Sequence, residues 1–161
     1  MLSSHSDADL LEKLLPAVRK YQELASKHGI DDIFQDNGGK VLQLLLTLGL
    51  QGIPGRNGND AVDANGVEYE VKTTNLDNVS PQFTTNHHLN LEILHKYRRA
   101  RWIFATYVGI EMEEVYLVEG VDLEDPYFTR WEGQLRDGTR NHINNPKIAI
   151  GHVRRVGERL V

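Results

Sequence analysis

Hydrophobic and polar residues alternate along one short stretch of the chain, from residue 67 to residue 72. The apolar members are Val67, Tyr69 and Val71, and the polar members between them are Glu68, Glu70 and Lys72. A period of two residues is typical of a β-strand with one buried and one polar face. The pattern predicts a strand whose polar face carries two carboxylates and an amine. Residues 59–66 before it supply the other half of a hairpin.

The turn of this hairpin determines which residues face each other across the two strands. A three-residue loop at residues 64–66, with its glycine in the left-handed conformation, pairs Asp63 with Val67 and puts Asp60 opposite Glu70. Directly opposed residues on one face have Cβ atoms about 5 Å apart. We predict this register, which brings the two carboxylates together.

The alternative is a two-residue loop, residues 65–66, which would place Asp60 opposite Val71 and facing away from the acids. In the predicted register the two carboxylates repel each other unless they share a proton or a cation. Lys72 lies two residues beyond Glu70 on the same face. The hairpin therefore predicts that Asp60 and Glu70 bind a divalent metal.

Apolar residues at helical spacing predict helices elsewhere in the chain. Residues 7–28 form the first predicted helix, with Pro16 as a possible kink. The second, residues 39–48, is apolar nearly all round, which indicates burial in the core or at a subunit contact. A short helix is expected from Leu91 to Tyr97, and the dipeptide at 125–126 is expected to open another one.

The remaining segments predict strands and loops. Residues 102–108 form a continuous apolar run, which predicts a buried strand, and residues 114–119 are expected to be its hairpin partner. A last strand is expected at residues 148–153. Residues 75–90 are polar without periodicity, and a loop of that length in a compact domain is usually functional or mobile. The chain has no internal repeat or linker, so a single domain over residues 1–161 is expected.

Composition adds a few constraints. The chain has 161 residues, 40% of them hydrophobic and 25% charged, as in a globular protein with a real core. It has no cysteine, which excludes disulfides and thiolate metal sites. No apolar run approaches the roughly 20 residues that span a bilayer, so a cytoplasmic location is expected. The net charge of −5 argues mildly against nucleic acid, but a local basic patch can still bind phosphates.

Each candidate residue also has an ordinary interpretation. An acid about ten residues before Glu70-x-Lys72 is a weak pattern, and the alternative is a solvated strand face with a surface ion pair. On the same hairpin, Asp63 falls on the apolar side and Glu68 lies nearer the turn, so neither is expected to join the site. The basic cluster at residues 96–101 is either a solvated helix face or a phosphate-binding surface.

Two pairs of adjacent residues, at 87–88 and 144–145, also have both an ordinary and a functional interpretation. The adjacent His87 and His88 would point to opposite sides of a strand, and no third ligand lies nearby, which disfavours a zinc site. They are ordinary loop residues or readers of a polar surface. Asn144 and Asn145 precede a proline and by default form a turn, although asparagine also pairs bidentately with adenine in DNA.

Several segments resemble the PvuII family of restriction endonucleases. The similarity covers nearly the whole chain in order, with few gaps, and is far more specific than any single motif. The segments that carry it are residues 28–40 (HGIDDIFQDNGGK), 54–63 (PGRNGNDAVD), 68–72 (EYEVK), 96–98 (KYR), 102–105 (WIFA) and 143–148 (INNPKI). The resemblance implies a restriction-endonuclease-like core of the PD-(D/E)xK type, which is a central mixed β-sheet with a catalytic hairpin flanked by helices.

The resemblance also implies roles for individual residues. Asp60 and Glu70 match metal-binding carboxylates, Lys72 a catalytic lysine, and Tyr97 a tyrosine near the metal. The residues that match positions of DNA contact are Asp36 towards the minor groove and Thr84, His87, His88, Asn144, Asn145 and Lys147. The family is homodimeric and uses Mg²⁺ to cut double-stranded DNA centrally at CAGCTG, leaving blunt ends. The N-terminal helices, about 7–50, are expected to form the dimer interface, and a cognate methyltransferase gene is expected as a genetic partner.

The chain departs from the family pattern at several positions. Asn57 replaces a glutamate near the active site, Asn86 replaces the first of three histidines, and residues 73–82 diverge. Because the other base-reading types are retained, we expect the same hexanucleotide. Two other classes are possible. A repair or junction-resolving nuclease would not need loops rich in Asn and His, and an inactive DNA-binding relative would not need both carboxylates and the lysine.

Overall fold

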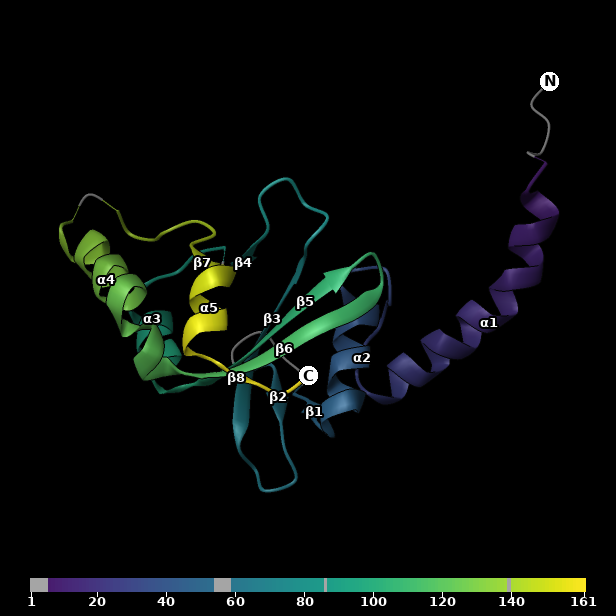
Figure 1. The fold of residues 1–161 in the computed structure, drawn as a ribbon, viewed down its shortest axis with the longest axis horizontal. Helices are drawn as coiled ribbons and strands as arrows, with labels where there is room; N and C mark the ends of the chain where they lie inside the picture. The colour runs from purple at the N-terminus through teal and green to yellow at the C-terminus, as the bar shows by residue number, and fades with distance from the viewer. Residues whose placement is uncertain (1–5, 54–58, 86, 139) are drawn as a thin grey trace.

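The computed structural model describes residues 6–53, 59–85, 87–138 and 140–161 (Figure 1). Asn57 and Asn86, at which the sequence departs from the family pattern, lie outside the described residues. No helix in the described part of the chain is long and apolar enough to cross a membrane.

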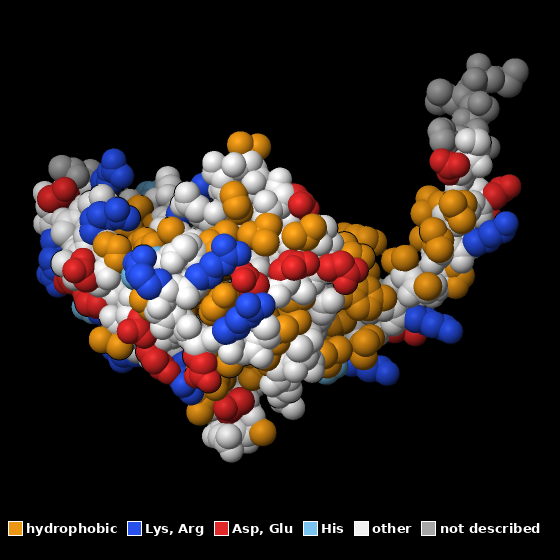
Figure 2. All heavy atoms as spheres, in the orientation of Figure 1, with side chains coloured by type: hydrophobic (Ala, Val, Ile, Leu, Met, Phe, Trp, Pro, Cys, Tyr) orange, Lys and Arg blue, Asp and Glu red, His pale blue; other side chains and the backbone are white. Residues whose placement is uncertain are grey.

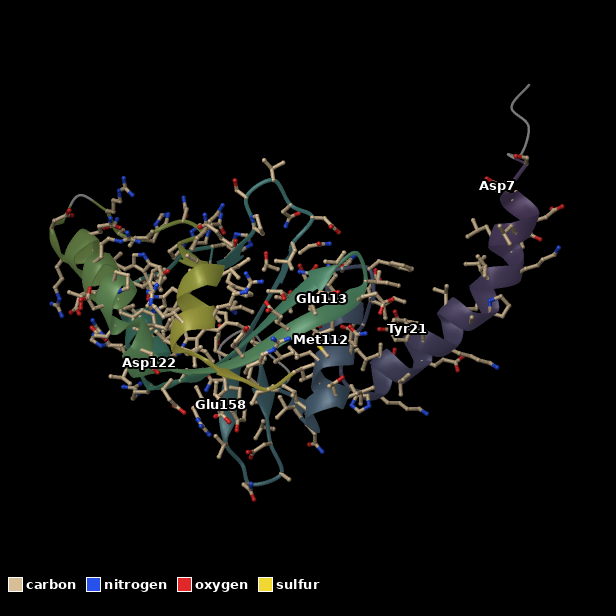
Figure 3. The ribbon with its side chains drawn as sticks, in the orientation of Figure 1. Asp7, Tyr21, Met112, Glu113, Asp122 and Glu158 are labelled. Carbon is tan, nitrogen blue, oxygen red and sulfur yellow. The ribbon has the colours of Figure 1, made fainter. Side chains whose placement is uncertain are left out.

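The chain begins with two helices, α1 (Ala8–Lys27) and α2 (Gly38–Leu48). Both agree with the predicted ranges to within one residue, and α1 continues through Pro16. Figure 1 shows α1 projecting away from the rest of the molecule, with its C-terminal part next to α2. At that point Tyr21, labelled in Figure 3, donates a hydrogen bond from its hydroxyl to the carbonyl of Gly39 at 2.8 Å.

A six-stranded sheet forms the centre of the fold. Its strands, in spatial order, are β1 (Gln51–Gly52), β2 (Ala61–Val62), β3 (Glu68–Asn75), β5 (Arg101–Val108), β6 (Glu111–Glu119) and β8 (Glu158–Arg159). The β3–β5 pair is parallel and the other pairs are antiparallel. A parallel pair needs a crossover connection, and this one contains α3 (Leu91–Arg99). The predicted mixed α/β architecture is confirmed.

The β2–β3 hairpin has the predicted three-residue register. Ala61 pairs with Tyr69 and Val62 with Glu68, so residues 64–66 form the loop. Gly66 has a φ of +81°, in the left-handed region that glycine adopts at no steric cost. The register places Asp60, one residue before β2, at the level of Glu70.

Alternation along β3 distributes its side chains between two cores. Tyr69 and Val71 pack with Leu44 and Leu45 of α2 on one face of the sheet. The other face is covered by a larger cluster that includes the aromatic residues Tyr97, Trp102, Phe104, Phe128 and Trp131. Glu70 and Lys72 point towards this second face. The predicted division of the strand into an apolar and a charged face is therefore correct, but Glu70 on the charged face is buried, with Tyr97 of α3 against it.

The C-terminal half differs from the predictions in three places. The segment at 125–126 lies in the short irregular helix η2 (Glu124–Phe128), which follows η1 (Gly120–Leu123) and in which Asp125 has non-helical φ and ψ angles; the regular helix α4 (Thr129–Arg136) follows η2 directly. The predicted strand at 148–153 is wrong beyond Ala149. The chain there forms β7 (Lys147–Ala149) and then α5 (Ile150–Val156), which buries Ile150 and Val153 at helical spacing.

The third difference lies in the segment predicted to be a loop, residues 75–90. It contains β4 (Gln82–Thr84), which pairs antiparallel with β7 in a separate two-stranded sheet. Phe83 is the buried residue of β4, and a strand with a single buried position shows no alternation in sequence. This small sheet brings the two segments that carry the predicted DNA-reading residues next to each other.

Candidate active site

The position of Asp60 is fixed by the hairpin. Its backbone amide donates to the carbonyl of Tyr69 at 2.9 Å, and its Oδ2 accepts a hydrogen bond from the amide of Val71 at 2.8 Å. The carboxylate is thus held by the neighbouring strand as well as by its own backbone. Its side chain is 45% exposed, so the remaining oxygen positions are open to solvent or a ligand.

Lys72 lies between the two carboxylates. Its Nζ is 2.6 Å from Oε1 of Glu70 and 3.3 Å from Oδ2 of Asp60. These two carboxylate oxygens therefore lie within 5.9 Å of each other, the sum of these two distances. Two carboxylates this close repel each other unless they share a proton or a cation. In this structure the shared cation is the Lys72 ammonium.

Glu70 is the most buried of the three groups, with a side chain that is 8% exposed. Burial raises the pKa of its carboxyl group, the Lys72 ammonium opposes this shift, and the Asp60 carboxylate adds to it. The Tyr97 hydroxyl forms a further hydrogen bond with the Glu70 side chain. Tyr97 is itself buried, and its ring meets that of Trp102 edge-on at a centroid distance of 4.6 Å. The structure thus brings Tyr97 to the acids, as the sequence predicts.

The two other acids of the hairpin have structural partners. Oδ1 of Asp63 accepts hydrogen bonds from the amides of Asn65 and Val67, both at 2.9 Å, and the Val67 bond is the main reason why the pKa of Asp63 is lowered. Its other oxygen accepts from the Tyr69 hydroxyl at 3.1 Å. Glu68 is exposed and accepts from the side chain of Asn59 at 3.0 Å. Both acids lie apart from Lys72, as predicted.

The donor set suits a hard divalent cation that keeps part of its water. Asp60 and Glu70 supply carboxylate oxygens, the ligands that Mg²⁺ prefers, and Mg²⁺ is usually bound by one or two carboxylates together with water and substrate phosphate. The described residues contain no group of three or more His, Cys, Asp or Glu side chains that could enclose a metal ion. The geometry therefore fits a metal shared with substrate better than a fully enclosed structural metal.

A cleft of about 900 Å³ runs along the β3 edge beside these groups. One wall comes from the start of α2 and the loop before it, and the other from β4 and the segments that follow β4 and precede β7. Of the residues singled out from the sequence, the cleft is lined by Asp36, Asp60, Lys72, Thr84, His87 and Asn145. Residues distant in sequence are thus gathered around a single open site.

The two segments of the second wall are joined by backbone hydrogen bonds. Thr84 pairs with Lys147 in the β4–β7 sheet, and Leu89 pairs with Ile143 in an isolated bridge. Between them, Thr85 donates to the Pro146 carbonyl from both its amide, at 3.0 Å, and its hydroxyl, at 3.1 Å. The span from 85 to 89 is one residue longer than the span from 143 to 146, and such an extra residue redirects side chains, as in a β-bulge.

In this irregular ribbon only one residue of each adjacent pair faces the cleft. His87 and Asn145 line the cleft, whereas His88 and Asn144 do not. The His88 ring lies edge-on to that of His142 at a centroid distance of 4.8 Å. Asn144 lines a separate, shallower hollow of about 430 Å³ beside His142. Lys147 is exposed on β7.

The basic cluster at residues 96–101 is largely engaged in ion pairs. Lys96 pairs with Glu92 at 3.4 Å. Arg98 pairs with Glu124 at 2.7 Å and with Glu132 at 2.6 Å, and Arg101 pairs with Glu119 at 2.6 Å. The Arg98 pairs join α3 to the segments that follow β6, the Lys96 pair lies within α3, and the Arg101 pair joins β5 to β6. The cluster is therefore mainly a structural surface, and the structure favours that alternative over phosphate binding.

Comparison with known protein families supports the same assignment as the site. The family described as restriction endonuclease PvuII matches residues 6–161. The chain belongs to this family. It is therefore a type II restriction endonuclease, a site-specific deoxyribonuclease with a restriction-endonuclease-like fold that binds DNA. The family typically depends on magnesium.

The cleft of this restriction endonuclease also contains residues to which the sequence analysis assigned no role. They include His28 at the end of α1, Lys40 on α2, and Asn75 and Asn78 at and beyond the end of β3. None of them stands in a motif whose spacing indicates chemistry. Their shared position arises from the packing of α1 and α2 beside β3, which local sequence patterns do not encode.

Proposed function

We propose that the enzyme hydrolyses double-stranded DNA at the palindrome CAGCTG, cutting at the centre to leave blunt ends, with Mg²⁺ as its cofactor. The observation that carries this proposal is the cleft, in which Asp60 and Lys72 lie between two walls of DNA-reading residue types, with Glu70 buried against Lys72. A nuclease of this kind would destroy its host's DNA, so a cognate methyltransferase is expected as a genetic partner.

In the proposed mechanism Asp60 and Glu70 hold the metal ion. When bound there, magnesium would supply positive charge that neutralises the scissile phosphate. Lys72 carries a fixed positive charge next to both carboxylates and would orient the attacking water or stabilise the charge that develops on the phosphate. Tyr97 would hold the Glu70 carboxylate in place through its hydroxyl.

Recognition is assigned to the two walls of the cleft. A two-stranded ribbon fits the major groove of DNA, which is about 12 Å wide, and the joined segments around β4 and β7 have this form. Asp36 lies on the opposite wall and would reach the minor groove. The proposed base and backbone contacts on the ribbon are Thr84, His87, His88, Asn144, Asn145 and Lys147.

The proposed enzyme is a homodimer of single-domain subunits, with the interface formed by residues of about 7–50. A palindrome cut on both strands requires two sites related by two-fold symmetry. Figure 2 shows hydrophobic side chains along the projecting α1. Leu10, Leu11 and Leu14 are each more than half exposed. Such a surface indicates a protein contact, and most of the stability of a helix in a protein comes from packing of its apolar face.

Light scattering at micromolar concentration tests the dimer. The wild-type chain should have twice the mass of one subunit, and Leu14→Arg should shift the protein towards the monomer because it places a charge in the apolar stripe. Glu12→Gln, on an exposed polar position of the same helix, is the matched control. A monomeric wild type would count heavily against this interface.

Digestion of plasmid DNA with Mg²⁺, followed by sequencing of the ends, tests the specificity. Blunt cuts confined to CAGCTG are the expected result. Cuts at another palindrome would keep the nuclease and overturn the specificity. If the chain does not cleave DNA in Mg²⁺ but binds it specifically in Ca²⁺, it is an inactive relative.

Paired substitutions on β3 test the catalytic assignment. Glu70→Gln should abolish cleavage while specific DNA binding partly survives, and Asp60→Ala should do the same. Glu68→Gln changes an exposed carboxylate on the same strand, held by Asn59, and should leave cleavage intact. Normal cleavage by Asp60→Ala would contradict the assignment.

A further inference from the structure

Lys40 is a second lysine of the cleft, and its position is set by a closed contact with Tyr107 of β5. The Tyr107 hydroxyl donates a hydrogen bond to the Lys40 carbonyl at 2.8 Å. The Lys40 ammonium in turn lies over the Tyr107 ring, 5.1 Å from its centroid. Tyr107 is fully buried, which makes it a rigid support. Tyr107 therefore holds the backbone of Lys40 through its hydroxyl and the side-chain ammonium through its ring.

The charge of Lys40 is not balanced by an acid. Lys40 and Lys72 are the two lysines among the described residues that line the cleft, and these residues include no arginine in its lining. Lys72 is neutralised by Glu70 and Asp60. In the described part of the chain no carboxylate forms an ion pair with Lys40, and its recorded partner is the face of an aromatic ring. A cation–π contact leaves the full positive charge available to an anion.

Lys40 lies on the same edge of the sheet as the acids but farther along it. Tyr107 is in register with Asn75 on the neighbouring β3, and Asn75 also lines the cleft. Asn75 follows Lys72 by three residues, which corresponds to about 10 Å along a strand. DNA carries a phosphate every 3.4 Å or so of helix axis on each strand. A duplex at the acids would thus present a different phosphate to Lys40.

We propose that Lys40, held by Tyr107, binds a backbone phosphate of the DNA other than the scissile one. This inference rests on the proposed function, because it assumes a duplex in the cleft. A contact of this kind fixes the position of the duplex relative to Asp60 and Glu70 but carries no sequence information. Lys40 is therefore an anchoring residue and not a reader of bases.

Salt dependence of binding measures the contact directly. Each neutralised phosphate contributes about 0.9 to the slope of log K against log[salt] on B-DNA, and a dimer has two copies of Lys40. Lys40→Gln should therefore reduce the magnitude of the slope by about 2 for a dimer. The assay is fluorescence anisotropy with the full chain in Ca²⁺, on one duplex that contains CAGCTG and another that lacks it.

Two further variants separate the contact from general effects. Lys40→Arg keeps the cation and should retain the wild-type slope. Lys96→Gln removes a lysine that is paired with Glu92 outside the cleft, and it should also retain the slope. The reduction by Lys40→Gln should be similar on both duplexes, because phosphate contacts are independent of sequence. Circular dichroism and urea unfolding verify that each variant is folded.

The outcomes distinguish this inference from the proposed function. If the wild type binds and cuts DNA but Lys40→Gln keeps the full slope, the phosphate contact is wrong and the nuclease assignment stands. If Lys40→Gln weakens binding at CAGCTG alone, Lys40 reads a base and the anchoring role is wrong. A wild type that does not bind either duplex would overturn both.

Discussion

Replacement of Lys72 by methionine removes the cation beside Glu70 while keeping a side chain of similar length. The two charged groups are 2.6 Å apart, and their side chains are 14% and 8% exposed. Removal of one partner of a buried ion pair typically costs about 3–5 kcal/mol, because the remaining charge is uncompensated. We expect Lys72→Met to destabilise the fold for this reason, in addition to its effect on cleavage.

Protonation of Glu70 limits the size of this loss. A carboxyl group with an ordinary pKa of 4.5 costs about 3.4 kcal/mol to protonate at pH 7, since each pH unit corresponds to about 1.36 kcal/mol. If keeping the buried Glu70 ionised without Lys72 costs more free energy than this, the carboxylate takes up a proton instead. The free energy of unfolding at pH 7 should therefore fall by about 3 kcal/mol.

The loss should become smaller in acid. Burial already raises the pKa of Glu70 in the wild type, and the Lys72 ammonium opposes that shift, so the variant has the more strongly raised pKa. A carboxyl whose pKa is higher in the folded state binds its proton there first. It favours folding at low pH, and this contribution is lost as the pH rises. Between pH 7 and pH 5.5 the variant should recover part of the lost stability relative to the wild type, and at most about 2 kcal/mol, which is the equivalent of 1.5 pH units for one proton.

Urea unfolding in EDTA, followed by circular dichroism at both pH values, measures these differences. The control is the double variant Glu70→Gln/Lys72→Met, which buries no charge and should unfold within about 1 kcal/mol of the wild type. If Lys72→Met is as stable as the wild type at pH 7, Lys72 does not compensate Glu70. A loss that is the same at both pH values would show that packing, and not charge, is responsible.

Two further substitutions test contacts around the site. Tyr97→Phe keeps the ring against its aromatic neighbours and removes the hydrogen bond to Glu70; it should cost about 1 kcal/mol in urea unfolding and slow plasmid cleavage. Tyr127→Phe removes the acceptor of the Ala149 amide at the end of β7. It should cost about 1–3 kcal/mol, because that amide loses its partner, and an unchanged midpoint in urea would show that the hydrogen bond contributes nothing.

The hairpin could be predicted in detail because local chemistry determines it. Alternation fixed which residues of β3 share a face. Gly66 fits both the two-residue and the three-residue loop, and the three-residue loop was predicted because it makes three charged groups converge on one face. The opposition of Asp60 and Glu70 follows from the alternation and this loop. The burial of Glu70 does not, because it depends on α3 and Tyr97, which come from a segment more than 20 residues away.

The elements that were missed depend on contacts distant in sequence. β4 and β7 are three residues long, and each is stabilised by the other, so neither shows a pattern of its own. The turn from strand to helix at Ile150 was missed because Ile148 and Ile150 fit the period of a strand, whereas Ile150 and Val153 fit that of a helix, and so short a stretch does not show where the period changes. Lys40 shows no local signal, and the cleft that gives it a role exists only after α2 packs beside β3.

A net charge of −5 is compatible with the binding of DNA because many of the acids are already neutralised by ion pairs outside the cleft. Many acids outside the cleft are already paired with arginines, as in the contacts of Arg98 with Glu124 and Glu132. Among the described residues in and beneath the cleft, the three carboxylates of Asp36, Asp60 and Glu70 outnumber the two lysine ammoniums. This balance repels a phosphate, and one divalent cation at the acids reverses it. Under the proposed mechanism, a divalent ion is therefore required for tight binding of DNA as well as for its cleavage.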